Sequence, residues 1–181
     1  FKDLRLKSAK FIGSLPFDGF GIGGSLGKTK QDMVEILKWV MPLLPSSKPK
    51  HLLGIGAVEE IFNCVEQGVD MFDCVAPTRW GRRGHLYIGP KSGGAFANKF
   101  RINIRLAKYK LDKKPIDKGC SCYVCKNYSR GYLRHLLVSK EISFHKLAAY
   151  HNEHFILNLM KEIRVAINKK KLKVLKKKWL G

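Results

Sequence analysis

Three cysteines in one short loop are the most specific chemical feature of the sequence. Cys120, Cys122 and Cys125 lie two and three positions apart in the segment GCSCYVC. Thiols at this spacing do not readily pair with one another, whereas a zinc ion needs four nitrogen or sulfur ligands in a tetrahedron. The spacing therefore predicts three ligands of a metal site, with a fourth ligand from elsewhere in the chain.

The fourth ligand is not fixed by the spacing. His151 stands just ahead of a long amphipathic segment and is the first candidate, because it would tie that segment to the cysteine loop. The rival histidines are His135, His145 and His154. Cys64 and Cys74 lie in apolar segments and are expected to be small core residues. Four protein ligands leave no open position, so the site would be structural.

One carboxylate, Asp73, ends an apolar segment in GVDMFDCVAP. A strand is predicted over residues 69–77, closed by Pro77, and β/α barrels place their active sites at the C-terminal ends of strands. A carboxylate there can attack a sugar carbon or stabilise positive charge on it. The alternative role is capping of the following turn, which Asp70 could perform equally well.

The elements that would position Asp73 alternate between short apolar runs and helical patterns. Such alternation with short links indicates a parallel α/β sheet. The predicted strands cover residues 19–24, 51–56 and 69–77, and the predicted helices cover residues 30–44 and 57–68. Three such units cannot close a (β/α)₈ barrel, which needs eight.

The pattern changes after Thr78, where basic residues become frequent. Residues 99–111 alternate apolar and polar side chains, which predicts an antiparallel strand with one solvated face. Two helices are expected after the cysteines, the second along an apolar stripe that begins at Phe155, and the tail is expected to be the end of a basic amphipathic helix. We therefore predict two domains, residues 1–77 and 78–181.

The charge of the chain indicates a polyanionic partner. Its 35 lysines and arginines against 14 acidic residues give a formal charge of +21, which favours nucleic acid, although scattered solvated lysines are the alternative. No apolar run approaches the ~20 residues of a membrane span, and no signal peptide is recognisable. A cytoplasmic protein without a membrane partner is expected, and five cysteines, an odd number, argue against a disulfide framework.

Four stretches resemble the C-terminal half of bacterial tRNA-guanine transglycosylase (queuine tRNA-ribosyltransferase). They are FDGFGIGGSLG, KPKHLLGIG, GVDMFDCVAPTRWGRRGHLY, and the CxCxxC pattern followed 26 positions later by His151. The resemblance implies an α/β fold, the C-terminal part of a (β/α)₈ TIM barrel with a zinc-binding subdomain and C-terminal helices. It implies exchange of the wobble guanine of GUN-anticodon tRNAs for a 7-deazaguanine, in queuosine biosynthesis.

The resemblance also assigns roles to individual residues. The aspartate matching Asp73 forms a covalent bond with the ribose of the RNA. One structural zinc ion is held by residues matching Cys120, Cys122, Cys125 and His151. The base pocket includes backbone of the segments matching Gly23, Gly24, Ser25, Leu53 and Gly54, since glycine allows a flat base to approach the main chain. Arginines matching Arg79 and Arg82 contact the anticodon loop, and a homodimer through the zinc-bearing region is a further implication.

The sequence departs from the family pattern in three respects. GGSLGKT (23–29) replaces the usual GGLAVGE, which leaves open which 7-deazaguanine is inserted. Residues 88–100 lengthen a loop, either as a basic hairpin against RNA or as a tolerated surface insertion. The family's N-terminal half, with its general acid/base, is not in this chain, so we expect the chain alone to be inactive. The alternative is a non-catalytic, zinc-stabilised tRNA-binding fragment or accessory subunit.

Overall fold

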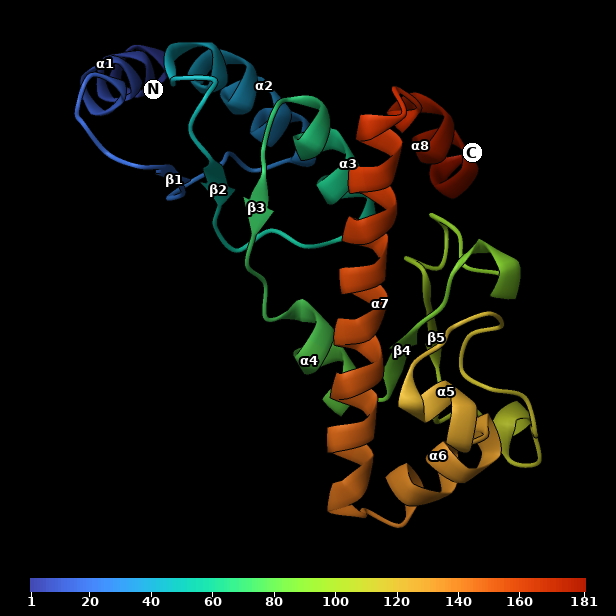
Figure 1. The fold of residues 1–181 in the computed structure, drawn as a ribbon. Helices are drawn as coiled ribbons and strands as arrows, with labels where there is room; N and C mark the ends of the chain where they lie inside the picture. The colour runs from blue at the N-terminus through green and yellow to red at the C-terminus, as the bar shows by residue number, and fades with distance from the viewer. The chain divides into compact units, whose positions relative to one another are not determined.

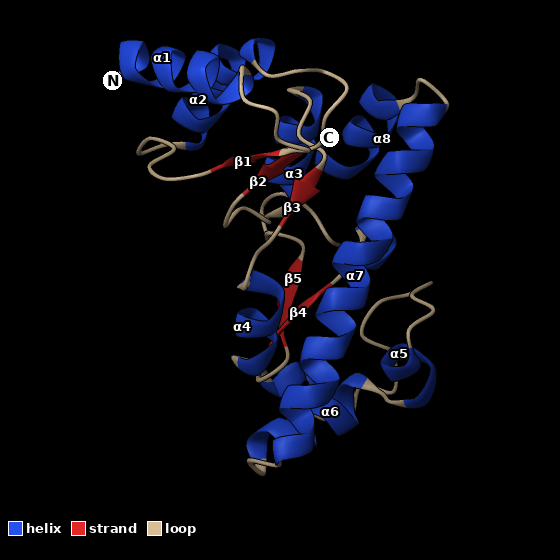
Figure 2. Cartoon of the chain, turned by 60° about the vertical axis from the view of Figure 1, so that its left-hand side comes forward, coloured by secondary structure: helices blue, strands red, loops and turns tan.

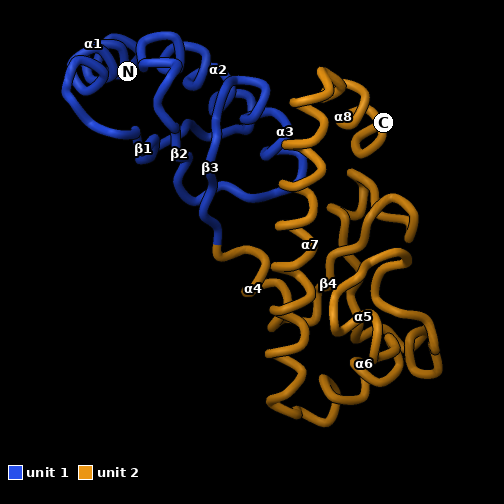
Figure 3. Tube along the Cα trace, in the orientation of Figure 1, with its two compact units in different colours: residues 1–74 blue, residues 75–181 orange.

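The computed structural model describes residues 1–181 and divides the chain into two compact units, residues 1–74 and 75–181 (Figure 3). Each unit has its own cluster of buried apolar side chains. No helix in either unit combines the length and the apolar character that a membrane span requires.

Unit 1 is built on three parallel strands (Figure 1). Its elements are α1 (Lys2–Gly13), β1 (Phe20–Ile22), α2 (Lys30–Val40), the 3-10 helix η1 (Met41–Leu43), β2 (Lys50–Leu52), α3 (Val58–Glu66) and β3 (Met71–Phe72). The strands are hydrogen-bonded in the order β1-β2-β3, and the register pairs Ile22 with Leu52 and Leu52 with Phe72. Because the strands are parallel, their carboxyl ends meet at one edge of the sheet.

The core of unit 1 is formed by the strands together with α1, α2 and α3. α2 begins at a capping box, in which Thr29 Oγ1 accepts a hydrogen bond from the backbone N–H of Asp32. Asp32 in turn accepts from the N–H groups of Thr29 and Lys28, and these donors hold the pKa of Asp32 below its usual value. The buried face of α2 that follows consists of Met33, Ile36, Leu37 and Val40.

Unit 2 is organised around one long helix, α7 (Ile142–Asn168), which at 1.5 Å per residue is about 40 Å long (Figure 2). Its other elements are α4 (Ala76–Arg82), β4 (His85–Tyr87), η2 (Pro90–Ser92), β5 (Arg101–Asn103), η3 (Ala107–Tyr109), α5 (Tyr123–Asn127), α6 (Arg130–Val138) and α8 (Leu172–Leu180). β4 and β5 are antiparallel and pair Leu86 with Ile102. α7 buries Phe144, Ala148, His151, Asn152, Phe155, Leu159, Ile163 and Ala166, a stripe at helical spacing.

The parallel α/β arrangement before residue 75 and the antiparallel pairing of the basic segment are confirmed. Several expected boundaries are wrong. The third strand ends at Phe72, and Pro77 lies in the first turn of α4, where a proline costs no helical hydrogen bond. Within residues 99–111 only Arg101–Asn103 is a strand. It begins after Lys99 and Phe100, whose φ angles of 53° and 54° are positive, and the chain turns into η3 beyond it.

The long helix also begins earlier than expected, at Ile142, so that His151 lies inside it rather than ahead of it. The expected helical tail is a separate helix, α8, which is joined to α7 by a short turn. Cys64 is fully buried in the core of unit 1, as expected. Cys74, in contrast, is only partly buried, with its Sγ 3.8 Å from the backbone oxygen of Gly54.

Candidate metal centre and strand-end carboxylate

The structure brings Cys120, Cys122, Cys125 and His151 to one point, with their ligand atoms within 4.8 Å of one another. His151 Nδ1 is 3.5 Å from the Sγ atoms of Cys122 and Cys125, and 3.9 Å from that of Cys120. A tetrahedral zinc ion with its usual bond lengths separates sulfur and nitrogen ligands by about 3.5 Å. The four side chains therefore fit a four-coordinate metal ion.

The ring of His151 is fully buried and is held from the side opposite the cysteines. Its Nε2 lies 2.8 Å from the backbone oxygen of Tyr87, to which it donates, so Nδ1 is the atom that faces the thiols. Burial lowers the pKa of His151, but the contacts with Cys120 and Cys122 outweigh burial and raise the pKa to about 9. A bound cation would take the place of a proton on Nδ1, because the ring must be neutral there to act as a ligand.

The thiols of the cluster cannot all ionise side by side without a cation. Hydrogen bonds from Cys120 and then Cys125 lower the pKa of Cys122, while the contacts with Cys120 and Cys122 raise the pKa of Cys125. The Sγ of Cys122 also accepts from the backbone N–H of Cys125 at 3.3 Å, at the start of α5. A divalent cation would remove the repulsion between neighbouring thiolates.

The rival histidines are not part of this group. His135 and His145 are exposed. His154 lies at the edge of the cluster, with Nδ1 3.8 Å from the Sγ of Cys120 and 3.1 Å from Nδ2 of Asn158. His151 is the histidine whose ligand nitrogen is close to all three thiols.

Asn152, the neighbour of His151, is a residue that the sequence reasoning missed. It is fully buried, and its Oδ1 accepts from the backbone N–H of Tyr87 at 2.9 Å. Its Nδ2 donates to the backbone oxygens of Pro77 and His85, at 2.9 Å and 3.0 Å. One amide thus ties α7 to β4 and to the first turn of α4. A polar residue at a core position of the helical stripe was the available signal.

α4 carries Arg79 and Arg82, both of which are exposed. On its other side this helix approaches α7 closely at Gly81, where a Cβ would lie 3.0 Å from the backbone carbon of Ala148. The close approach requires glycine, since any side chain would separate the two backbones. Asn152 and Gly81 therefore both hold α4, the helix that presents the two arginines, against α7.

Asp73 follows the last residue of β3, at the carboxyl edge of the sheet in unit 1. Its side chain is 56% exposed, and Oδ1 accepts from the backbone N–H of Gly54 at 3.3 Å. His51, a second residue that the sequence reasoning missed, places Nε2 3.1 Å from the same oxygen, although the pair does not have hydrogen-bond geometry. Only the pairing of β2 with β3 creates this contact, so no pattern of residue types indicates it.

Asp70 has a different role from Asp73. Its Oδ2 accepts from the backbone N–H of Lys50 at 2.9 Å, at the beginning of β2. This bond links the segment before β3 to the opposite, amino end of the neighbouring strand. Of the two aspartates, Asp73 is the one at the carboxyl edge.

The remaining predicted contacts to the base lie at the same edge, on the loops after β1 and β2. Gly23 packs against Leu53, because a Cβ on this glycine would lie 2.7 Å from Leu53 Cδ1. Gly24 and Gly54 have positive φ angles of 73° and 76°, which favour glycine. Ser25 completes the first loop and is exposed. The fold thus brings these five residues to the edge that carries Asp73.

Arg5 on α1 holds the first of these loops. Its guanidinium donates to the backbone oxygens of Gly23 at 3.0 Å and Ser25 at 2.5 Å. The planar fork of arginine suits two acceptors at once, so one side chain fixes the loop from both sides of Gly24. Sequence reasoning missed this residue because its partners are backbone atoms 18 and 20 positions away.

Comparison with known proteins gives one consistent result. The family model described as "Queuine tRNA-ribosyltransferase" matches residues 1–181. A protein from Archaeoglobus fulgidus is 57% identical over 181 residues, which are 100% of this chain and 45% of that protein. The queuine tRNA-ribosyltransferase of Roseiflexus sp. is 42% identical over 181 residues, 100% of this chain and 44% of the relative. That of Bacillus velezensis is 45% identical over 173 residues, 95% of this chain and 43% of the relative. The chain therefore spans somewhat less than half the length of these relatives.

Proposed function

The chain belongs to the queuine tRNA-ribosyltransferase family, and on that premise we propose that the protein exchanges the wobble guanine of GUN-anticodon tRNAs for a 7-deazaguanine in queuosine biosynthesis. The observation that carries the proposal is the position of Asp73. This carboxylate stands at the carboxyl edge of a parallel sheet, beside two glycine-containing loops that leave backbone groups accessible. A nucleophile and a flat base need this combination of an exposed oxygen and a closely approachable main chain.

The proposed reaction has two steps at one carbon atom. An Asp73 oxygen bonds to C1′ of the ribose as the bond from C1′ to guanine breaks, and guanine leaves with a proton from a general acid. The incoming deazaguanine then attacks C1′ through its ring nitrogen, which gives up its proton to the conjugate base of that general acid, and the bond from C1′ to Asp73 breaks to release the carboxylate. A carboxylate suits both steps, because it stabilises the oxocarbenium-like charge and is also a good leaving group.

The backbone groups of the loops at residues 23–25 and 53–54 would hold the base in this scheme. The bond from Gly54 N–H to Asp73 Oδ1 would keep the carboxylate oriented towards the ribose. Arg79 and Arg82 would bind the anticodon loop, since planar guanidinium groups suit phosphates and splayed bases.

The metal of the Cys120, Cys122, Cys125 and His151 group would be a single zinc ion with a structural role. Soft thiolate ligands in a tetrahedral arrangement favour zinc, and four protein ligands leave no position for a substrate. We assign residues 1–77 to the last βα units of a TIM barrel and residues 78–181 to a zinc-binding subdomain with C-terminal helices. A homodimer through the zinc-bearing region and a cytoplasmic location complete the proposal.

The decisive experiment measures release of labelled guanine from substrate tRNA by the full-length protein that contains these residues. Asp73→Asn should slow release by a factor on the order of 10⁴, because an amide of the same shape cannot act as the nucleophile. Asp70→Asn is the matched control, since its amide oxygen can still accept from Lys50 N–H. Release by Asp73→Asn at the wild-type rate would exclude Asp73 as the nucleophile.

A further inference from the structure

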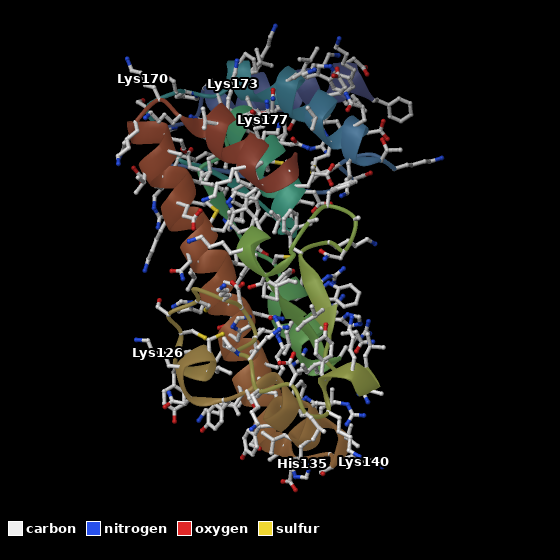
Figure 4. The ribbon with its side chains drawn as sticks, turned by 90° about the vertical axis from the view of Figure 1, so that its right-hand side faces the viewer. Lys126, His135, Lys140, Lys170, Lys173 and Lys177 are labelled. Carbon is white, nitrogen blue, oxygen red and sulfur yellow. The ribbon has the colours of Figure 1, made fainter.

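The end of unit 2 at the turn between α7 and α8 is strongly basic. Residues 161–181 contain nine lysines and arginines and a single acidic residue, Glu162. Lys170, Lys173 and Lys177 lie together around this turn and are exposed (Figure 4). These three residues, here called the turn lysines, form no ion pair in the structure.

The turn lysines are presented by a helix that is firmly docked. Trp179 of α8 is only 8% exposed, and its ring centroid lies 5.5 Å from that of Phe100 and 5.7 Å from that of Phe155. Its Nε1–H donates to Glu162 at 3.3 Å, so the one carboxylate of the segment is engaged by the tryptophan. Lys173 and Lys177, four residues apart on α8, are therefore neighbours on a fixed surface.

Lys170 occupies a backbone position that favours glycine. Its φ angle is 55°, and the N–H groups of Lys170 and Lys171 close the end of α7 on the carbonyls of Ile167 and Ala166. A lysine in this left-handed conformation is less favourable than glycine, and this exposed side chain adds no packing in return. The turn itself therefore does not explain why a lysine is present.

Lys140 provides an internal reference for this argument. It has a φ angle of 60° at the turn between α6 and α7, and it is also exposed. It lies at the opposite end of α7 from the turn lysines (Figure 4). The two lysines thus share charge, exposure and backbone conformation but belong to different surfaces.

From this arrangement we infer that the turn lysines bind the phosphate backbone of the tRNA. A rigid row of unpaired cations complements a regular row of phosphates, and such contacts supply affinity without reading sequence. The inference rests on the proposed function, which supplies tRNA as the polyanion, and it adds residues of α8 and of the turn before it to Arg79 and Arg82 of α4 as RNA contacts. No residue of the metal centre takes part.

The test measures tRNA affinity of the full-length protein as a function of salt for Lys170→Gly and Lys140→Gly. One phosphate contact adds about 0.9 to the magnitude of the slope of log affinity against log salt. This corresponds to about eightfold in affinity at 0.1 M salt relative to 1 M salt. Lys170→Gly should lower the tRNA affinity by up to this factor. Because the change relieves backbone strain, the melting temperature should stay equal or rise. Lys140→Gly should keep wild-type affinity with the same relief of strain.

A Lys173→Gln/Lys177→Gln variant, which leaves the turn unaltered, should lower the slope by about 1.8. Its KM for tRNA should rise while kcat stays unchanged, and a non-substrate tRNA should lose affinity by the same factor. Equal losses for Lys170→Gly and Lys140→Gly would show a general charge effect and overturn the inference. Unchanged affinity of the lysine variants, with an active wild-type protein, would overturn it and leave the proposed function standing. A wild-type protein that neither binds tRNA nor exchanges guanine would instead refute the proposed function.

Discussion

Asn152→Ala tests whether one buried amide holds unit 2 together around the metal centre. The change removes three hydrogen bonds of 2.9–3.0 Å, one from the N–H of Tyr87 and two to the carbonyls of Pro77 and His85. At about 1 kcal/mol for each buried bond, the loss is about 3 kcal/mol. The higher helix propensity of alanine returns about 0.5 kcal/mol, so the free energy of unfolding should fall by about 2.5 kcal/mol.

The measurement is urea unfolding followed by tryptophan fluorescence, to which Trp80 and Trp179 of unit 2 contribute. Asn168→Ala, at the exposed end of the same helix, is the control and should change the free energy by less than about 0.5 kcal/mol. Asn152→Asp should be worse than Asn152→Ala, because it buries a carboxylate oxygen against two carbonyl oxygens. If Asn152→Ala were as stable as the Asn168→Ala control, the amide would not be the link between α7, β4 and α4.

Three further outcomes are expected. Removal of the metal with a chelator, or Cys122→Ser, should abolish bound zinc in elemental analysis and lower the melting temperature, while kcat for exchange at saturating tRNA stays near wild type in the protein that remains folded. Arg5→Ala should loosen the loop that carries Gly23 and Ser25, raising KM for the incoming base about tenfold with unchanged tRNA affinity; an unaltered KM would show that the loop holds its own shape. Gly81→Ala should cost about 1–3 kcal/mol in unfolding experiments, because its Cβ would press on the backbone of Ala148, whereas Gly21→Ala, with its nearest neighbour at 3.9 Å, should cost less.

Much of this architecture could be predicted because it depends on local patterns. The alternation of apolar runs and helical periodicity indicated the parallel strands of unit 1, and the cysteine spacing indicated a metal site. The start of α7 was missed because His151 and Asn152 interrupt the apolar stripe, although both side chains are fully buried. These polar groups are stable in the core only through partners more than 25 positions away, which periodicity cannot reveal.

The contacts around the carboxyl edge of unit 1 were beyond sequence reasoning for a related reason. The approach of His51 to Asp73 depends on the parallel register of β2 and β3. Arg5 donates its hydrogen bonds to backbone atoms of the loop at Gly23. Neither leaves a pattern of residue types. The family resemblance predicted which residues should gather at this edge, but it did not name these two neighbours.

The contacts within unit 2 explain how a metal ion that takes no part in the chemistry would affect RNA binding. His151 would hold the metal through Nδ1, and it contacts the carbonyl of Tyr87 through Nε2, while Asn152 beside it accepts from the N–H of the same tyrosine. The same amide reaches the first turn of α4, the helix that presents Arg79 and Arg82. Loss of the metal would remove one restraint on the ring of His151 and weaken the contact of α7 with β4. The position of α4, which carries the two arginines, would then be less well fixed. Metal removal should therefore weaken tRNA binding before it alters the reaction at Asp73, because the carboxylate is oriented by Gly54, a residue of the other unit.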